Sequence, residues 1–195
     1  MSATAVAPRT GRAASLPADE RRAAIIDAVV PLLREFGEVV TCRQIAIAAG
    51  IAEGTIFRVF ADKDELLLAA FEREVDLAPL EASIRKIDPD LPFEQRLIEA
   101  TELMQRRVVD IWALVSKLGP ILHDRGKRPL DNSEALTEIF ATEQSSLTTD
   151  PADAARMLRG FTFSLTHPML ASEQKAAHEI VAVFLHGIVR AEGDA

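Results

Sequence analysis

The sequence predicts an all-α fold. Apolar residues recur every three or four positions in each long segment, as they do on the buried face of a helix. No segment alternates apolar and polar residues as a half-buried strand would. Helix-starting signals stand at three places, namely Thr41 to Gln44, Asp62 to Glu65, and Asp150-Pro151. With 195 residues the chain can bury the core of one or two small helical domains.

The first expected helix extends from Asp19 to Gly37. Its apolar residues fall at positions i, i+3, i+4, i+7, i+8 and i+11, which places them in one broad stripe, and Gly37 ends the pattern. Pro31 lies inside this helix and removes one main-chain donor, so we expect a kink there.

Two short helices joined by a glycine turn follow. Thr41 to Gln44 has the form of a capping box, and Gly50 can adopt the positive φ that ends a helix. The next helix is expected from about Ala52 to Phe60. Its inward-facing residues are Ile56, Val59 and Phe60.

The remaining helices are expected on the same grounds of spacing and caps. Asp62 begins a fourth helix that reaches about Ala78, and we place the boundary between the two parts of the chain near Asp76 to Leu80. Residues 87–92, IDPDLP, form the first clear break. The later helices are expected at 93–118, at 133–143, from 150 to about 167, and from about Ser172 onward.

Composition limits the classes of protein that the chain can represent. Its 48% hydrophobic and 27% charged residues are typical of a soluble globular protein, and we expect a cytoplasmic one because neither a membrane-spanning run nor a secretion signal is visible. One cysteine cannot form an intrachain disulfide, and the four histidines lack metal-ligand spacing, so no metal or cofactor is expected. The net charge of −8 argues against coating nucleic acid non-specifically but allows local positive charge.

Residues 49–66, AGIAEGTIFRVFADKDEL, carry the most specific pattern in the chain. The run resembles the helix-turn-helix signature of TetR-type transcriptional regulators, A-G-[VI]-[ST]-x-G-T-[IL]-Y-x-[HY]-F-x-[SD]-K-x-x-L. Phe57 stands where that family commonly has tyrosine. The resemblance extends back to about Arg21 and so covers roughly the first third of the chain.

The resemblance implies three parts: a flexible N-terminal arm (1–18), a three-helix DNA-binding domain with the helix-turn-helix (19–78), and a helical effector-binding and dimerisation domain (79–195). It implies a homodimer, formed through the last two helices, that binds a palindromic operator. It also implies a repressor that an unknown, apolar small molecule releases. The arm contains Arg9 and Arg12, so it is either a frayed tail or a segment that enters the minor groove.

Arg58 is the leading candidate for a base contact, because a bidentate arginine–guanine pair discriminates by about 1–3 kcal/mol; contact with phosphate alone is the alternative. Phe57 has no phenolic hydroxyl, which leaves stacking or contact with a thymine methyl group. Glu53 either accepts from cytosine or favours the helix dipole. The expected DNA-binding residues are Thr41, Cys42, Arg43, Glu53, Gly54, Thr55, Phe57, Arg58 and Lys63.

Five large side chains on the central helices are candidates to line an effector pocket, although each is also a normal core residue. They are Met104, Trp112, Phe140, Met157 and Phe161.

Two other classes of function stay open. A helical small-molecule carrier or enzyme with a vestigial helix-turn-helix would need a catalytic constellation, yet no activated nucleophile, carboxylate pair or phosphate-cradling loop is visible, so we expect no enzyme. A non-specific architectural DNA-binding protein is opposed by the acidic net charge.

Overall fold

The computed structural model describes residues 17–118 and 132–186, and within these ranges all regular structure is helical, as predicted. The elements are α1 (Ala18–Phe36), the 3-10 turn η1 (Gly37–Val39), α2 (Cys42–Ala49), α3 (Glu53–Ile56), α4 (Lys63–Glu74), α5 (Ala78–Ile84), α6 (Phe93–Leu118), α7 (Glu134–Ala141), the 3-10 turn η3 (Gln144–Ser146), α8 (Pro151–Thr166) and α9 (Ala177–His186).

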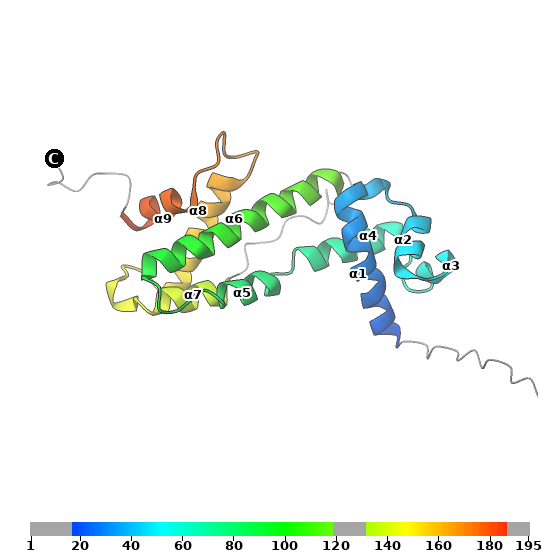
Figure 1. Cartoon of the computed structure of the whole chain (residues 1–195), viewed down its shortest axis with the longest axis horizontal. Coiled ribbons are helices and arrows are strands. Elements are labelled where there is room, and N and C mark those ends of the chain that lie inside the picture. The colour runs from blue at the N-terminus through cyan, green and yellow to red at the C-terminus, as the bar shows by residue number, and fades with distance from the viewer. Residues whose placement is uncertain (1–16, 119–131, 187–195) are drawn as a thin grey trace, which may run out of the picture.

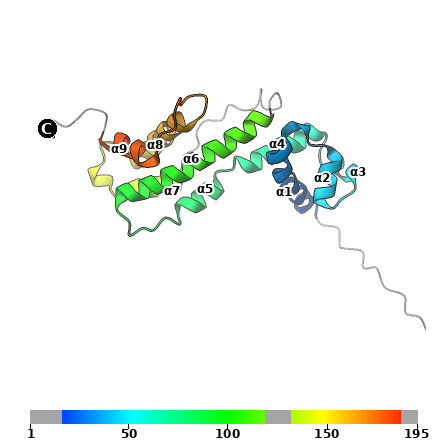
Figure 2. The ribbon, with the colours of Figure 1, turned by 45° about the horizontal axis from the view of Figure 1, so that its top comes forward.

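The described helices form an elongated arrangement with two ends (Figure 1). Helices α1 to α4 gather at one end, whereas α7, α8 and α9 lie at the other. Helix α6 packs against α8 and α9 over one part of its length and against α1 and η1 over another, so it joins the two ends. A second view shows that α3 lies far from α9 (Figure 2).

Each end has its own hydrophobic core. The N-terminal core combines buried residues of α1 to α4 with Leu114 and Leu118 from the last turns of α6. The C-terminal core combines buried residues of α5 to α9, and Phe140 lies at its centre with edge-on contacts to Phe93 and Phe184. Helix α6 therefore contributes to both cores, and the core of the N-terminal part includes residues beyond 19–78.

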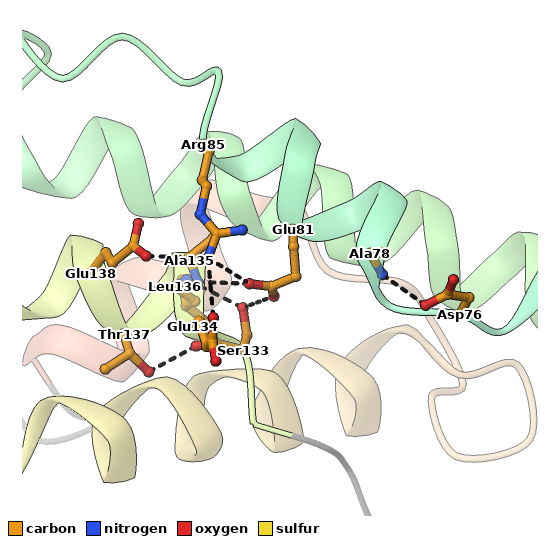
Figure 3. A network of polar contacts seen from close by, with 10 residues as sticks. All are labelled: Asp76, Ala78, Glu81, Arg85, Ser133, Glu134, Ala135, Leu136, Thr137 and Glu138. Atoms are coloured by element: carbon orange, nitrogen blue, oxygen red, sulfur yellow. Dashed lines mark hydrogen bonds and ion pairs between the residues drawn. The ribbon is translucent and has the colours of Figure 1, made fainter.

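A carboxylate from α5 fixes the beginning of α7 (Figure 3). The side chain of Glu81 accepts hydrogen bonds from the Ser133 hydroxyl and from the Ala135 amide, the latter at 2.7 Å. Ser133 also caps α7 by accepting from the Leu136 amide at 3.2 Å. Arg85 forms ion pairs with Glu81 and with two carboxylates of α7. The start of α7 thus depends on a partner about fifty residues earlier in the chain.

The third helix is shorter than expected. Helix α3 ends at Ile56, and the predicted extension to Phe60 is wrong. The amides of Arg58 and Val59 donate to carbonyls three residues earlier, at 3.2 and 3.0 Å, which is the tighter spacing of a 3-10 turn. The predicted inward residues do face the core, since Ile56 and Phe60 are fully buried and Val59 is half-buried.

Two further boundaries differ from expectation. Helix α4 ends at Glu74 instead of about Ala78, because Asp76 accepts from the Ala78 amide and α5 begins there with Pro79 in its first turn. Helix α9 begins at Ala177 instead of about Ser172, and the Ala176 amide donates to Glu179 at 2.9 Å. Helix α6 has the predicted bounds, and Asp150 caps α8 as predicted.

Helix α1 continues past Pro31, which is exposed, to Phe36. Two expectations concern residues that the structure does not describe: most of the N-terminal arm and the last part of the final helix.

Candidate nucleic-acid interface

The predicted capping box at the start of α2 is present. The Thr41 hydroxyl accepts from the Gln44 amide at 3.2 Å, and the Gln44 side chain accepts from the Thr41 amide at 2.8 Å. The hydroxyl also donates to the same Gln44 oxygen at 2.7 Å. Because the only hydroxyl proton of Thr41 is used within the cap, the main role of this residue in the described structure is to begin α2.

A left-handed glycine sets the turn between α2 and α3. Gly50 has φ 64° and ψ 32°, and the Ile51 amide donates to the Ala46 carbonyl at 3.0 Å. This is the bond pattern of a Schellman motif, in which glycine accepts the left-handed conformation without steric cost. The turn directs α3 away from α2. Ala52 is the N-cap residue of α3 and provides no side-chain cap, since alanine has no acceptor to offer.

The exposed surface of this segment carries most of the predicted DNA-binding side chains. Ile56 is fully buried, so it holds α3 against the core while its neighbours point outward. Phe57 is 51% exposed, an unusual state for an unpaired aromatic ring. Ile47 on α2 is 72% exposed and was missed by sequence reasoning. The predicted residues that are exposed are Thr41, Arg43, Glu53, Gly54, Phe57 and Arg58.

The other three predicted residues are half-buried. The Lys63 ammonium donates to the Glu38 carbonyl at 2.6 Å and so ties the start of α4 to η1, with two further donors left over. Cys42 packs against the N-terminal core. Thr55 lies within α3, and its amide donates to the Ala52 carbonyl at 2.8 Å.

Charge in the segment differs in sign from that of the chain. Residues 41–63 contain three basic and two acidic residues, a net charge of +1, whereas the whole chain carries −8. Arg43 and Arg58 are both exposed and have no ion pair among the described residues. Two uncommitted guanidinium groups, one at the start of α2 and one just after α3, suit phosphate and base-edge acceptors.

A cluster around Arg22 fixes the chain directly after α3. The Arg22 guanidinium donates to the Val59 carbonyl at 3.1 Å, forms an ion pair with Glu65 at 3.0 Å and lies 4.2 Å from the centre of the Phe60 ring. We call Arg22, Val59, Phe60 and Glu65 the Arg22 cluster. It joins α1, the turn after α3 and the first turn of α4. Sequence periodicity gave no signal for it because its members are distant in the chain.

Glu65 has a second task at the start of α4. Its carboxylate accepts from the Ala61 amide at 2.7 Å, and its own amide donates to the Asp62 side chain at 2.8 Å. The bond from Ala61, and then the bond from Arg22, lower the pKa of Glu65 below its usual value of 4.5. The ionised carboxylate is therefore the form that supports this turn.

The predicted pocket residues are only partly brought together. The ring centres of Phe140 and Phe161 lie 6.1 and 6.4 Å from the ring centre of Phe184. The ring centre of Trp112 lies 4.5 Å from that of His167. Met104 is buried in the C-terminal core. Met157 is 55% exposed on α8, a position that points outward from the described chain.

Buried polar side chains between α6 and α8 were missed by sequence reasoning. Thr101 and Gln105 lie one turn apart on α6, and Thr162 and Thr166 lie one turn apart on α8. Gln105 donates to the Thr166 hydroxyl at 3.2 Å and to the Lys175 carbonyl at 2.8 Å. The signal available in the sequence was the matching i, i+4 spacing of the two polar pairs.

The described ranges show neither a metal-binding cluster nor a membrane-spanning helix. No group of three or more histidine, cysteine, aspartate or glutamate side chains there is arranged to hold a metal ion. None of the helices in this part of the chain combines the length and apolar character that crossing a bilayer requires.

Residues 25–70, which contain α2 and α3, match the family of bacterial regulatory proteins described as the tetR family. Three solved structures share the fold over most of the chain. FadR of Thermus thermophilus, a transcriptional repressor solved with lauroyl-CoA, is 19% identical (TM-score 0.56, covering 89% of this chain and 98% of that one).

The other two structures are also similar over nearly their whole length. A transcriptional regulator from Mesorhizobium loti is 17% identical, with a TM-score of 0.55 and coverage of 88% of this chain and 98% of that chain. FadR of Bacillus halodurans, a regulator of fatty acid degradation, is 18% identical, with a TM-score of 0.53 and coverage of 86% and 96%. At these identities the likeness shows a shared fold.

Proposed function

We propose that this chain, a transcriptional regulator of the TetR family, binds a palindromic operator as a homodimer and is released from it by a small-molecule effector. The observation that carries the proposal is the exposed surface of α2 and α3. It combines a locally fixed turn, two uncommitted arginines and a positive segment charge in an acidic chain. The match of residues 25–70 covers this surface.

In the proposed complex α3 enters the major groove. Arg58 follows α3 directly and is exposed, so it is our candidate for a bidentate contact with guanine. Arg43, at the start of α2, is our candidate for a phosphate contact that fixes register. Phe57 offers its exposed ring to a thymine methyl group, and Lys63 retains donors for a phosphate after its bond to Glu38.

Two features support the homodimer. One helical pair contacts too few bases for high specificity, and two half-sites about 34–36 Å apart are the usual remedy. Apolar side chains are also exposed at the far end of the molecule, on α8, on α9 and in the connection between them. They are Met157, Met169, Leu170 and Val183. A second copy that packs on α8 and α9 would cover them.

The proposed effector is an apolar small molecule bound among the helices of the C-terminal part. Two buried hydroxyls there, those of Thr101 and Thr162, have no hydrogen-bond partner in the described structure. Each could form a hydrogen bond with a ligand. A ligand that supplies such a bond would favour one arrangement of α6 and α8 over another. A coupling of about 1–3 kcal/mol between effector and operator is sufficient for a switch.

An electrophoretic mobility-shift assay on the DNA upstream of the gene tests the proposal. We expect a shift at low salt that Arg43→Ala weakens on all sequences alike and that Arg58→Ala weakens chiefly on the specific site. Lauroyl-CoA, the compound bound to the similar Thermus thermophilus FadR, is a reasonable first compound for reversing the shift. Absence of a shift together with tight binding of a small molecule would favour the carrier instead.

A further inference from the structure

A shallow groove of about 450 Å³ lies between α1 and α4. Each side contributes residues at i, i+3, i+4 and i+7, so one stripe of each helix faces the groove. Its apolar part consists of three half-buried side chains, Ala23, Ile26 and Ala69. The charged lining residues are Asp19, Arg22, Glu72, Arg73 and Asp76. The groove therefore offers a short apolar strip with charged groups around it.

Both arginines of the groove already have carboxylate partners from outside the lining. Arg22 pairs with Glu65 and Arg73 pairs with Asp27, each with a nitrogen–oxygen distance of 3.0 Å. Because each guanidinium is neutralised by its partner, these two pairs add no net positive charge to the groove.

The carboxylates of the lining, those of Asp19, Glu72 and Asp76, are exposed. Asp19 forms no hydrogen bond or ion pair among the described residues. Asp76 accepts from the Ala78 amide at 3.1 Å, and the nearby guanidinium of Arg107, which binds the Asp76 carbonyl, offsets part of its charge. Even with Arg107 included, the groove and its ion-pair partners contain five carboxylates and three guanidinium groups. The groove therefore favours a cationic partner.

A cationic segment lies directly before the groove in the chain. Residues 1–16, which make up most of the N-terminal arm, contain Arg9 and Arg12 and no acidic residue. They precede the first described residue, Pro17, and Asp19 of the groove follows two positions later. In an extended chain Arg12 can lie up to about 17 Å from Pro17, whereas the α1 side of the groove is about 10 Å long. The arm is therefore long enough to fold back along the groove.

We propose that the N-terminal arm docks in the groove between α1 and α4 of its own chain. The guanidinium groups of Arg9 and Arg12 pair with the exposed carboxylates, Asp19 among them, and the methylene groups of the arginines lie on the apolar strip. Closing a loop of about ten residues costs little, because the entropic cost grows only with the logarithm of loop length. A docked arm is withheld from DNA, and only this consequence rests on the proposed function.

The rate of trypsin cleavage after Arg9 and Arg12 in the full chain measures the docking, because trypsin cleaves the fraction of molecules in which the arm is undocked. A synthetic peptide of residues 1–16, in a parallel reaction, is the matched reference, since it has the same cleavage sites and no groove. Early products are identified by mass spectrometry. No DNA is present, so the result does not depend on operator binding.

At low salt we expect both sites to be cleaved at least about threefold more slowly in the full chain than in the peptide. In about 0.5 M salt, where exposed charges are screened within a few ångströms, the two rates should converge. Equal rates at low salt, or protection that persists at high salt, would overturn the proposal. Protection that disappears when the chain is diluted would also overturn it, because docking within one chain does not depend on concentration.

Two variants test the place of docking. Asp19 and Glu20 are both exposed in the first turn of α1, so Asp19→Asn and Glu20→Gln lose the same favourable interaction with the helix dipole. Of these two residues, only Asp19 lines the groove. We expect Asp19→Asn to raise the low-salt cleavage rate about twofold, toward that of the peptide, and Glu20→Gln to leave it nearly unchanged. Equal effects of the two variants, or no effect of Asp19→Asn, would contradict docking in this groove.

The mobility-shift assay on the same protein preparation separates this inference from the proposed function. Operator binding without salt-sensitive protection of Arg9 and Arg12 would reject the docked arm and leave the regulator intact. Salt-sensitive protection without operator binding would reject the proposed function and keep the docked arm.

Discussion

The pairs α2–α3 and α8–α9 are both formed by consecutive helices, but they are stabilised in different ways. The α2–α3 turn depends on bonds between residues at most five positions apart, from the capping box to the Gly50 turn. The connection between α8 and α9 is held instead by Gln105 of α6, which is 61 positions from Thr166 and 70 from Lys175. The α2–α3 pair has a locally fixed shape, whereas the shape of the C-terminal part depends on how its helices pack.

This difference has a functional meaning under the proposed mechanism. A reading surface must keep its geometry to recognise a fixed sequence, so local bonds serve it well. A body that responds to a ligand must have more than one accessible arrangement of its helices. Helix α6 contributes residues to both cores and so connects the α2–α3 pair to the C-terminal helices.

The largest expected effect comes from a change at that link. Gly37 has φ 61° and ψ −141°, and a Cβ atom there would lie 2.7 Å from the Lys117 Cβ and from the Lys117 carbonyl oxygen. Lys117 also donates to the Arg34 carbonyl. Gly37→Ala combines a forbidden backbone conformation with a clash against α6, so we expect it to lower the free energy of unfolding by about 2–5 kcal/mol in urea.

Gly50→Ala is the matched control for this change. Gly50 also has a positive φ, but a Cβ atom added there would meet no neighbouring side chain or segment within 4 Å. Only the backbone strain remains, and we expect Gly50→Ala to lower the free energy of unfolding by about 1–2 kcal/mol. Equal losses in the two variants would mean that the contact between η1 and α6 contributes nothing.

A change confined to the body should have the next largest effect. Glu81→Ala removes both acceptors at the start of α7 and leaves the buried Ser133 hydroxyl without this partner. We expect a loss of about 1–3 kcal/mol in thermal or urea unfolding. Glu138→Ala removes only an exposed ion pair with Arg85 and should cost less than about 1 kcal/mol. The reverse order would contradict the role given to Glu81.

A change near the proposed DNA-binding surface of α2 and α3 should affect DNA binding more than stability. Arg22→Ala removes the contacts of the Arg22 cluster to Val59, Phe60 and Glu65, so we expect a loss of about 1–2 kcal/mol in stability and a several-fold loss in operator affinity. If Arg22 acts only by positioning the segment after α3, the salt dependence of binding should stay the same. A fall of about one in the slope of log affinity against log salt would show instead that Arg22 contacts a phosphate.

A smaller gain is expected at the start of α3. Ala52→Ser gives this helix the side-chain acceptor that it lacks, and should raise the free energy of unfolding by about 0.5–1 kcal/mol. Ala52→Val, which adds bulk without an acceptor, is the control. A melting temperature that rises equally in both variants would show that capping is not the cause.

The smallest effect at neutral pH is expected from Glu65→Gln, and it should grow more apparent in the acid dependence. The folded-state pKa of Glu65 is lowered, so its contribution is present above the unfolded value and is lost as the pH falls below about 4.5 through the folded-state pKa. Between pH 7 and pH 3, the free energy of unfolding should therefore depend less on pH in Glu65→Gln than in the wild type. The same pH dependence in both proteins would show that ionised Glu65 does not stabilise the fold.

The contrast between the two pairs also explains what could be predicted from the sequence. The capping box at Thr41, the turn at Gly50 and the cap at Asp150 are local, and each was predicted and confirmed. The bounds of α6 were predicted because its apolar spacing is continuous over the whole helix. The early end of α3 was missed, because the change to 3-10 spacing after Ile56 leaves the apolar pattern unaltered.

Contacts between distant segments were beyond local reasoning. The Arg22 cluster, the Glu81 bonds to α7 and the place of Leu114 in the N-terminal core all join residues more than thirty positions apart, or different parts of the chain. The proposed DNA-binding residues were predicted through the motif, and the structure shows six of them exposed. Their contacts with DNA stay predictions until a complex is measured.

In the proposed complex, Arg58 of each copy of a dimer contacts the bases of one half-site. The most direct measurement is selection of bound sequences from a random duplex pool, followed by binding of wild type and Arg58→Ala to the enriched sequence and to an unrelated duplex. We predict a palindromic sequence with half-sites one helical turn apart, and a variant that loses specificity for one position in each half-site while its non-specific binding stays within a few-fold. A pool without an enriched sequence, or a variant with unchanged specificity, would contradict the account.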